Sequence, residues 1–347
     1  MIVKDIIDRL KQKGTLPIEE FLVLLSNFSQ EDLEYICSIS QKIAEENFGR
    51  NIYIRGLIEI SNYCKNDCLY CGIRASNKNS SRYRLSKEQI ISSCEIGYSL
   101  GFRTFVMQGG EDPRQTDDFI VELIQEIRKR YSDVAITLSL GEKPEVSYRR
   151  FFEAGANRYL LRHETSSISH YSRLHPEKMS LSNRLECLRN LKKIGFQTGT
   201  GIMVGSPYQT NEDILGDIRF IEELKPQMIG LGPFLPHKDT PFREFAAGNL
   251  EKTLLLLAIF RIMHPKALIP STTALATLHP EGRLRGILAG CNVVMPNLSP
   301  TENRSKYSLY NDKAALGAES AEGLLLLQKQ LDQIDYKISY ERGDFEG

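Results

Sequence analysis

The sequence predicts an α/β fold: a closed or nearly closed (β/α)8 barrel of the TIM type, with a helical extension at the N-terminus and a tail at the C-terminus. Short apolar runs alternate with amphipathic runs of helical length from residue 52 onward. Eight such apolar runs occur, and strands that alternate with helices form parallel sheets. The length of 347 residues also suits a barrel of about 250 residues with extensions.

The segments before and after the barrel are expected to form separate parts of the chain. Residues 1–48 contain three amphipathic runs of helical period, and Ser29 is a suitable N-cap for the third, 31–46. We expect this extension to cover the bottom of a barrel formed by residues 49–300. Residues 301–347 are expected to close the barrel as a C-terminal segment.

Each expected element follows from the hydrophobic period of its stretch. The expected strands are 52–60, 103–108, 134–140, 157–161, 196–204, 227–232, 266–271 and 291–295. The expected helices between them are 86–100, 116–131, 144–154, 181–194, 211–224, 250–263 and 280–289. Ser86 and Gln89 form a capping box at the first of these helices. Active sites of such barrels lie at the carboxyl ends of the strands, so the polar residues there are the functional candidates.

Three cysteines, Cys64, Cys68 and Cys71, follow the first expected strand within eight residues. Thiolates are soft ligands that suit iron–sulfur clusters, zinc or Cu(I). Zinc usually takes four ligands, and the other four cysteines are isolated in the sequence. A [4Fe–4S] cube held by three cysteines would leave one iron open to another chelator. A zinc site and three reduced thiols without a ligand are the alternatives at this point.

Composition excludes several classes of function. Lys plus Arg and Asp plus Glu both number 44, so the formal net charge is zero and a dominant electrostatic grip on nucleic acid is not expected. The longest apolar run, 254–260, is too short to span a bilayer. The first residues lack the plan of a signal peptide. Seven cysteines, three of them at metal-binding spacing, favour the reducing cytoplasm over a disulfide framework.

The spacing C-x-x-x-C-x-aromatic-C, with Tyr70 as the aromatic residue, resembles the signature of the radical S-adenosylmethionine (SAM) superfamily. In that superfamily the cysteines hold a [4Fe–4S] cluster, and the amino and carboxylate groups of SAM chelate the open iron. One electron from the cluster cleaves SAM to methionine and a 5′-deoxyadenosyl radical. The resemblance therefore implies an enzyme that binds a [4Fe–4S] cluster through three cysteines, together with SAM.

Other strand ends carry groups that suit SAM. Gly109-Gly110-Glu111 resembles the "GGE" element of the superfamily, which meets the amino group of SAM, although two glycines at a strand end are by themselves more typical of a turn. Arg162 and Glu164 end the fourth strand, where a guanidinium can bind a carboxylate and a carboxylate can bind a ribose or an amine.

Two further kinds of candidate lie at these ends. Arg184, near the start of the helix 181–194, is a candidate for the methionyl carboxylate, with a solvated arginine as the alternative. Hydroxyl groups at strand ends can bind anionic or carbonyl-bearing substrates. They belong to Thr137, Ser139, Thr272 and Thr273.

Over roughly residues 50–345 the sequence resembles one branch of the superfamily, the [FeFe]-hydrogenase maturase HydE, which is related to biotin synthase and methylornithine synthase. The stretches 159–165 and 229–237 are the most specific to this branch. By position, the resemblance implies that SAM is held by Tyr70, Gly109, Gly110, Glu111, Glu164, Arg184 and Val204. It implies that the substrate chamber is lined by Gln108, Thr137, Ser139, Arg162, Thr272, Thr273, Met295 and Tyr307.

This resemblance implies a step in building the two-iron subcluster of the hydrogenase H-cluster. The substrate would be a small organometallic molecule, a cysteine-bound iron with carbonyl and cyanide ligands. The partners would be a tyrosine-lyase type of radical SAM maturase, a GTPase scaffold, and a low-potential electron donor such as ferredoxin or flavodoxin. Some members carry extra C-terminal cysteines for an accessory cluster. This chain has none after Cys291, so we expect a single cluster.

Two other functions fit the same motifs. A methylornithine-synthase-like mutase would bind an amino acid such as lysine and would need a fixed carboxylate for its side-chain amine, for which Glu142 or Asp112 are candidates. An iron–sulfur carrier that is not an enzyme would hold a cluster without cleaving SAM, and the polar strand ends would then be idle.

Overall fold

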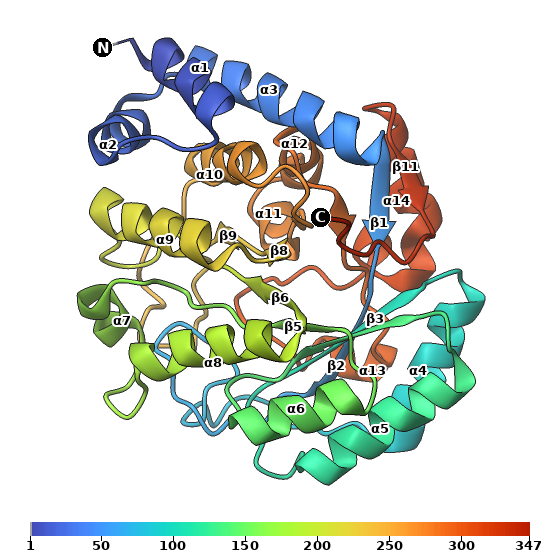
Figure 1. The fold of residues 1–347 in the computed structure, drawn as a ribbon. Helices are drawn as coiled ribbons and strands as arrows, with labels where there is room; N and C mark the ends of the chain where they lie inside the picture. The colour runs from blue at the N-terminus through green and yellow to red at the C-terminus, as the bar shows by residue number, and fades with distance from the viewer. Residues whose placement is uncertain (1) are drawn as a thin grey trace.

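The computed structural model describes residues 2–347, and its centre is a barrel of parallel strands surrounded by helices (Figure 1). One six-stranded sheet forms most of the wall, in the order β2-β3-β4-β5-β6-β8, and each neighbouring pair in it is parallel. These strands are β2 (Gly56–Ser61), β3 (Thr104–Gly109), β4 (Ala135–Ser139), β5 (Arg158–Leu160), β6 (Gln197–Thr200) and β8 (Met228–Ile229). The fold class predicted from the alternation of elements is confirmed.

The wall is closed by the segment 266–271 together with β10 (Val293–Val294) and β1 (Asn51–Ile54). Through single parallel bridges, Leu268 joins β8, Pro270 joins β10, and Asn297 joins β2. β10 also pairs in parallel with β1. The expected strand 266–271 therefore takes its place in the ladder only through isolated bridges, and Pro270 within it has no N–H to donate.

Three strands expected to be continuous are broken. The expected strand 52–60 divides at Arg55, because β1 pairs with β10 and with the C-terminal strand β11 (Lys337–Ser339), whereas β2 pairs with β3. The expected strands 196–204 and 227–232 each end in a separate short strand. These are β7 (Met203–Val204) and β9 (Gly232–Pro233), which pair with one another.

Helices cover the outside of the barrel (Figure 1). They are α1 (Val3–Lys13), α2 (Ile18–Asn27), α3 (Gln30–Phe48), α4 (Lys87–Ser99), α5 (Asp117–Arg130), α6 (Glu145–Glu153), α7 (Ile168–Leu174), α8 (Leu181–Ile194), α9 (Asn211–Leu224), α10 (Leu250–Met263), α11 (Thr273–Leu278), α12 (Gly282–Leu288), α13 (Thr301–Arg304) and α14 (Leu324–Asp332). Two short 3-10 helices, η1 (Gly317–Glu319) and η2 (Ala321–Gly323), precede α14. The predicted caps are confirmed, since Ser29 and Ser86 both form capping boxes.

The buried apolar residues form two main clusters between the barrel wall and the helices. The second contains Ile6 of α1, Leu24 of α2 and Ile36 of α3 together with Leu257 of α10. The N-terminal helices are therefore integrated into the outer layer, where α1 and α3 lie along α10 (Figure 1).

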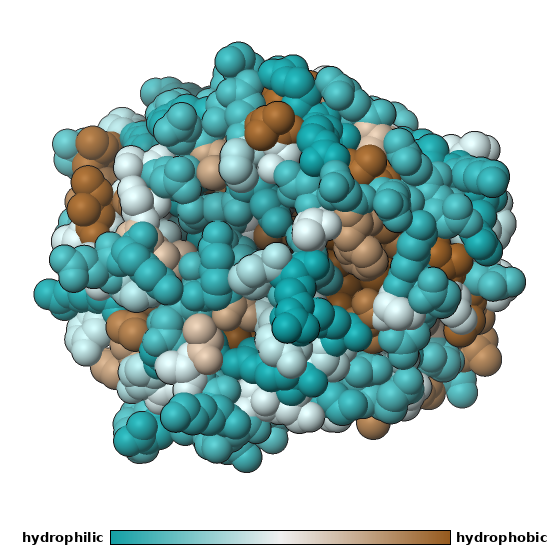
Figure 2. Space-filling model, turned by 90° about the horizontal axis from the view of Figure 1, so that it is seen from below, coloured by the Kyte–Doolittle hydropathy of each residue, from teal (hydrophilic) through white to brown (hydrophobic). Residues whose placement is uncertain are grey.

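The C-terminal segment runs back to the start of the barrel. β11 pairs in parallel with β1, and the fully buried Arg158 of β5 donates hydrogen bonds to the carbonyl of Gly343 at 2.9 Å and to the carboxylate of Asp344 at 2.7 Å. The face seen from below in Figure 2 is mainly hydrophilic, with hydrophobic residues in separate patches. None of the helices within residues 2–347 is long and apolar enough to cross a membrane.

Candidate active site

The three clustered cysteines lie on the loop that follows β2. Cys64, Cys68 and Cys71 are half-buried, and each of them is a free thiol. The backbone N–H groups of Asn66 and Glu111 point to the sulfur of Cys64. The Lys65 N–H donates to the Glu111 carbonyl at 2.9 Å, so the loop is fixed to the end of β3.

Burial holds these thiols in their protonated form in the absence of metal. It raises the pKa of Cys64, raises that of Cys71 to about 12, and raises that of Cys68, where Cys71 and Cys64 add to the effect. Bound metal would supply the charge that favours thiolates. Across residues 2–347, no three His, Cys, Asp or Glu side chains converge on a point that could hold a single metal ion. A [4Fe–4S] cluster does not need its three cysteines to meet at one point, because each cysteine binds a different iron.

The glycine strip after β3 lets its backbone pass against this loop. The Gly110 N–H donates to the Ser61 carbonyl at 3.1 Å. A Cβ at Gly110 would lie 2.2 Å from the Tyr63 carbonyl oxygen and 2.8 Å from the Cys64 Cβ, which is closer than atoms can approach. A side chain cannot be accommodated here, because the backbone of the strip passes directly against the cysteine loop.

Tyr70, between two of the cysteines, is half-buried and points to His175. Its hydroxyl lies 3.1 Å from His175 Nε2. Burial lowers the pKa of His175 to about 3, with the Arg184 charge adding to the effect, so this imidazole is neutral at pH 7. The hydrogen bond fixes the aromatic residue of the motif against the C-terminal end of α7.

The charged candidates form two adjoining ion pairs. Arg162 Nη2 lies 3.0 Å from Glu164 Oε2. The Arg184 side chain pairs with Glu142, and its Nη1 donates to the Arg162 carbonyl at 2.8 Å. Burial by itself would lower the pKa of Arg184, but the Glu142 carboxylate outweighs burial and raises it. The four residues therefore form a continuous charged group, although the two arginines were expected to face ligands and are paired within the chain.

Glu111 completes the polar rim beside this group. Its side chain accepts from the Glu142 N–H at 3.0 Å and lies 3.2 Å from Lys65 Nζ. Val204, the remaining candidate for SAM, is buried in β7, where its carbonyl accepts from the Phe234 N–H at 2.9 Å. The predicted SAM residues thus come from four strand ends (β2, β3, β5 and β7) and from one helix, α8.

The predicted substrate residues come from several strands and from the segments that follow them. Gln108 and Ser139 occupy the same level of β3 and β4. Gln108 Nε2 lies 3.4 Å from the hydroxyl of the buried Tyr307. Met295 packs against an apolar cluster that contains Met228 and Leu268.

The threonines of this group differ in how they are bonded. Within the described chain, the buried hydroxyls of Thr137 and Thr272 find no hydrogen-bond partner, and the same holds for Arg162 Nε. Thr273 instead donates to Glu319 at 2.9 Å. Buried polar atoms are normally paired, so the three orphaned atoms are the groups in this part of the barrel that best suit a bound polar ligand.

One charged pair in the barrel was not predicted from the sequence. Glu59 of β2, fully buried, pairs with Lys313 from the C-terminal segment and accepts from Asn297 Nδ2 at 2.9 Å. Lys313 Nζ also lies 5.0 Å from the centre of the Tyr307 ring. Glu59 stands in an otherwise apolar strand, and that was the available signal. No feature of the sequence singled out Lys313, because its loop has no periodic pattern.

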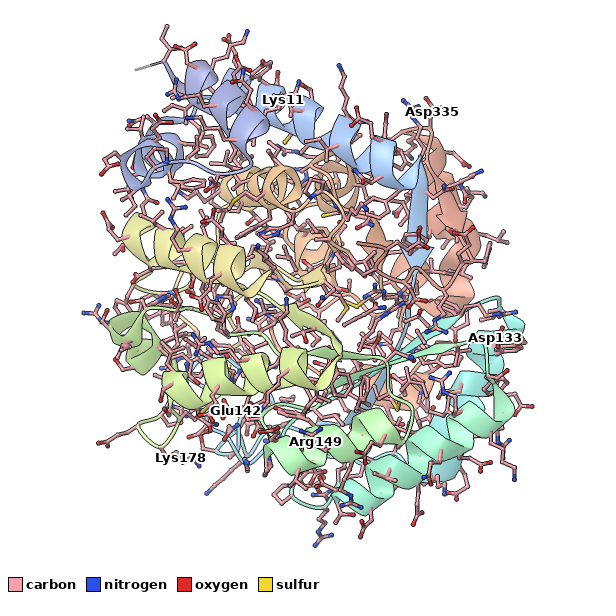
Figure 3. All side chains as sticks on the ribbon, in the orientation of Figure 1. Lys11, Asp133, Glu142, Arg149, Lys178 and Asp335 are labelled. Carbon is pink, nitrogen blue, oxygen red and sulfur yellow. The ribbon has the colours of Figure 1, made fainter. Side chains whose placement is uncertain are left out.

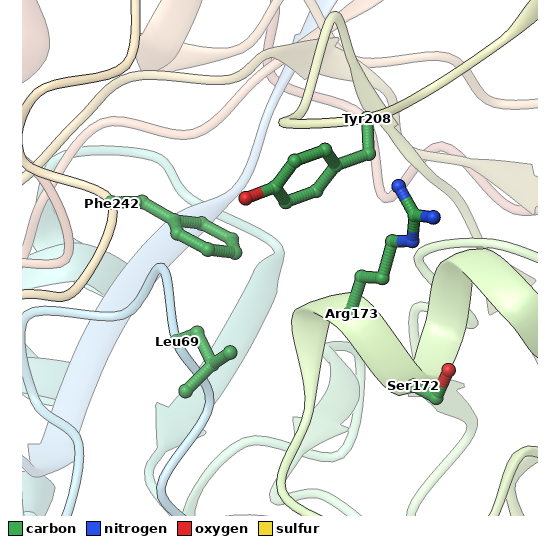
Figure 4. Close-up of a pocket in the computed structure, with 5 residues that line it drawn as sticks. All are labelled: Leu69, Ser172, Arg173, Tyr208 and Phe242. Carbon is green, nitrogen blue, oxygen red and sulfur yellow. The ribbon is translucent and has the colours of Figure 1, made fainter.

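Two pockets open beside the cysteine loop. One, of about 200 Å³, is lined by Lys65, Glu111, Glu142, Lys178 and Met179 among others, and Figure 3 shows Glu142 and Lys178 on the same side of the molecule. The second, of about 380 Å³, is lined by Leu69, Ser172, Arg173, Tyr208 and Phe242. Figure 4 shows the Arg173 guanidinium extended toward Tyr208, whose ring centre lies 4.9 Å away.

Comparison with known proteins agrees with this geometry. Residues 58–221 match the family model described as the radical SAM superfamily. The chain is 40% identical over 310 residues to the [FeFe] hydrogenase maturase subunit HydE of Thermotoga maritima, covering 89% of this chain and 88% of that protein. It is 30% identical over 297 residues to 3-methylornithine synthase of Methanosarcina acetivorans, covering 83% and 82%.

A solved structure of a related protein has the same fold. The crystal structure of methylornithine synthase (PylB) superposes with a TM-score of 0.81 at 25% identity, covering 96% of this chain and 97% of that one. The cysteine loop after β2 and the glycine strip after β3 lie inside the matched region. The chain is thus an enzyme of the radical SAM superfamily and belongs to the group that includes HydE and 3-methylornithine synthase.

Proposed function

We propose that the protein is a HydE-type maturase, which reductively cleaves SAM and acts on a cysteine-bound iron carbonyl–cyanide precursor during assembly of the [FeFe]-hydrogenase H-cluster. The observation that carries the proposal is the meeting of three half-buried thiols, a glycine strip that excludes side chains and orphaned polar atoms at one end of a barrel. The 40% identity to HydE over most of both chains supports this choice of branch.

Cys64, Cys68 and Cys71 are proposed to hold a [4Fe–4S] cluster with one open iron. With SAM bound, this centre would supply one electron and generate a 5′-deoxyadenosyl radical. The backbone of Gly109 and Gly110 admits the methionine moiety close to the loop. Tyr70, Glu111, Glu164, Arg184 and Val204 would complete the SAM site. Pairing with Glu142 keeps Arg184 charged and oriented for a carboxylate.

The interior residues are proposed to bind the organometallic substrate. The unpaired hydroxyls of Thr137 and Thr272 and Nε of Arg162 can donate to its anionic or carbonyl groups. Gln108, Ser139, Thr273, Met295 and Tyr307 would complete the chamber. The surrounding barrel excludes water, which protects a reactive intermediate.

We propose a cytoplasmic protein that receives its substrate from a tyrosine-lyase type of maturase and acts with a GTPase scaffold. A low-potential ferredoxin or flavodoxin would supply the electron. The absence of cysteines after Cys291 supports a single cluster.

The amino-acid mutase is less well supported. The carboxylates considered for a substrate amine are engaged: Asp112 pairs with Arg84 at 2.6 Å, and Glu142 pairs with Arg184. The third carboxylate nearby, Glu59, is paired with Lys313. A lysine substrate would have to displace one of these cations.

The test is anaerobic. The chain is reconstituted with iron and sulfide, reduced and given SAM, and 5′-deoxyadenosine is quantified against Cys68→Ser. Cys94→Ser, at a buried cysteine on α4, is the matched control. Product formed by the wild type and the control but not by Cys68→Ser is expected. A full cluster signal without 5′-deoxyadenosine would contradict the enzyme and favour a carrier.

A second step distinguishes the two substrates. The cysteine–iron–carbonyl–cyanide complex and lysine are supplied separately under turnover. We expect the complex, and not lysine, to be consumed with SAM. Conversion of lysine would instead identify a mutase.

A further inference from the structure

The segment that carries Arg162 and Glu164 has a strained backbone. Glu164 has a φ of 65°, a left-handed conformation that residues other than glycine seldom adopt. Its N–H donates to the Gly201 carbonyl at 3.0 Å, and it bridges Ile202 in parallel. Such a conformation persists only where the surroundings hold it, so neighbouring groups must fix this segment.

The side chain next to Glu164 enters a buried polar cluster on the outside of the barrel. His163 is fully buried, with Nδ1 2.8 Å from the Thr200 hydroxyl and Nε2 3.4 Å from Asp217 Oδ1. Asp217, on α9, is also fully buried. The His163 ring packs edge-on against Phe220, one turn further along the same helix. Burying a carboxylate costs folding free energy unless the group is hydrogen-bonded, so the bonds that Asp217 makes identify what this side chain does.

Asp217 also holds the other side of Glu164. Its Oδ1 accepts the Ser166 N–H at 2.5 Å. The helix can approach this closely because residue 216 is a glycine, and a Cβ there would lie 3.0 Å from Ser166 Oγ. One carboxylate oxygen on α9 thus faces both residue 163 and residue 166, which flank the strained position.

We propose that Asp217 and His163 are positioning residues for the SAM site: they lock the backbone of Glu164 so that its carboxylate faces the barrel interior. His163 Nδ1 shares a hydrogen bond with the Thr200 hydroxyl at 2.8 Å, whereas Nε2 faces Asp217 Oδ1 at 3.4 Å without a hydrogen-bond partner among the described residues. His163 and Glu164 point to opposite sides of the wall, so the outer pair sets the orientation of the inner carboxylate. Glu164 as a SAM ligand rests on the proposed function.

The test compares deletion of each bonding group with its conservative replacement. Asp217→Val removes the acceptor of the Ser166 N–H, and His163→Leu removes the partner of the Thr200 hydroxyl. Asp217→Asn keeps an oxygen, and His163→Gln keeps an amide that can bond the hydroxyl. Hydrogen-bond partners behind metal-ligating side chains are typically worth roughly 10–100-fold in metal affinity or activity, and we expect the lower end of this range for a side chain that binds SAM. We expect the two deletions to raise KM for SAM about tenfold with kcat for 5′-deoxyadenosine within twofold, and the two conservative variants to stay near the wild type.

A second measurement needs neither cluster nor SAM. Amide hydrogen exchange of the peptide 162–167 should accelerate in both deletion variants and stay slow in both conservative ones. Ile218→Val, which removes one buried methylene group from the same helix, controls for a general loss of stability and should leave this peptide unchanged.

The outcomes separate the two hypotheses. Unchanged exchange and unchanged KM in the deletion variants would overturn the positioning role, as would equal losses in the deletion and conservative variants. A wild type that makes no 5′-deoxyadenosine would refute the proposed function. In that case the exchange result still decides whether His163 and Asp217 fix the segment.

Discussion

Lys313, on the C-terminal segment, pairs with the carboxylate of Glu59, which is fully buried in β2. The two residues are separated by most of the length of the chain. Their contact fixes the segment that bears Tyr307 over the barrel interior, where the Lys313 ammonium also lies 3.3 Å from the Tyr307 carbonyl. The pair therefore connects closure of the barrel to the candidate substrate chamber.

Lys313→Met should destabilise the fold strongly. Removing one partner of a buried ion pair leaves an uncompensated charge and costs about 3–5 kcal/mol in the free energy of unfolding. The double variant Lys313→Met with Glu59→Gln should recover most of this loss, as measured by urea unfolding. Lys329→Met, at an exposed position on α14, is the control and should stay within about 0.5 kcal/mol. Equal losses in the single and double variants would show that the pair is not the cause.

Gly110→Ala should disrupt the cysteine loop. Its Cβ would collide with the Tyr63 carbonyl and Cys64, so the backbone must shift, at a typical cost of about 1–3 kcal/mol for overpacking. We expect lower iron incorporation and weaker SAM binding. Gly230→Ala is a matched control, because the nearest atom to its Cβ among the described residues is the Thr200 carbonyl oxygen at 3.9 Å. Normal iron content in Gly110→Ala would contradict the close approach.

Thr137→Val and Thr272→Val should leave the fold at least as stable while impairing turnover. The hydroxyls have no partner within residues 2–347, so replacing them by a methyl group removes a buried unsatisfied group. Thermal unfolding and substrate consumption measure the two effects. Thr273→Val is the comparison, because its hydroxyl donates to Glu319 and its loss should cost about 1 kcal/mol. Full turnover in the first two variants would remove these hydroxyls from the substrate site.

His264, remote from the candidate site, should make stability depend on pH. Burial lowers its pKa from 6.5 to about 4 in the folded chain. As pH falls, the unfolded chain therefore takes up the proton first. The stability present above pH 6.5 is lost between pH 6.5 and 4, by about 3 kcal/mol from this group. His264→Gln should flatten the pH profile of the unfolding free energy in this window. Parallel profiles for the variant and the wild type would contradict this.

Much of the barrel and the centre of the candidate site followed from local pattern. The period of the apolar residues predicted the order of strands and helices. The cap at Ser29 was predicted from its residue type ahead of an amphipathic run, and the capping box at Ser86 from Gln89 three positions later. The cysteine loop and the glycine strip were identifiable for the same reason, since their spacing is short. Both features depend on neighbours in the sequence, which are visible without the fold.

The tertiary structure alone decided the features that join residues distant in the chain. The change of strand partner at Arg55 requires β11, almost 300 positions later. The Arg184–Glu142 pair, the Glu59–Lys313 pair and the cluster behind Glu164 each join side chains from separate elements. A sequence pattern records which face of an element is apolar. It does not record which charged groups meet once the barrel closes, because that depends on register and on loop paths fixed by packing of the whole chain.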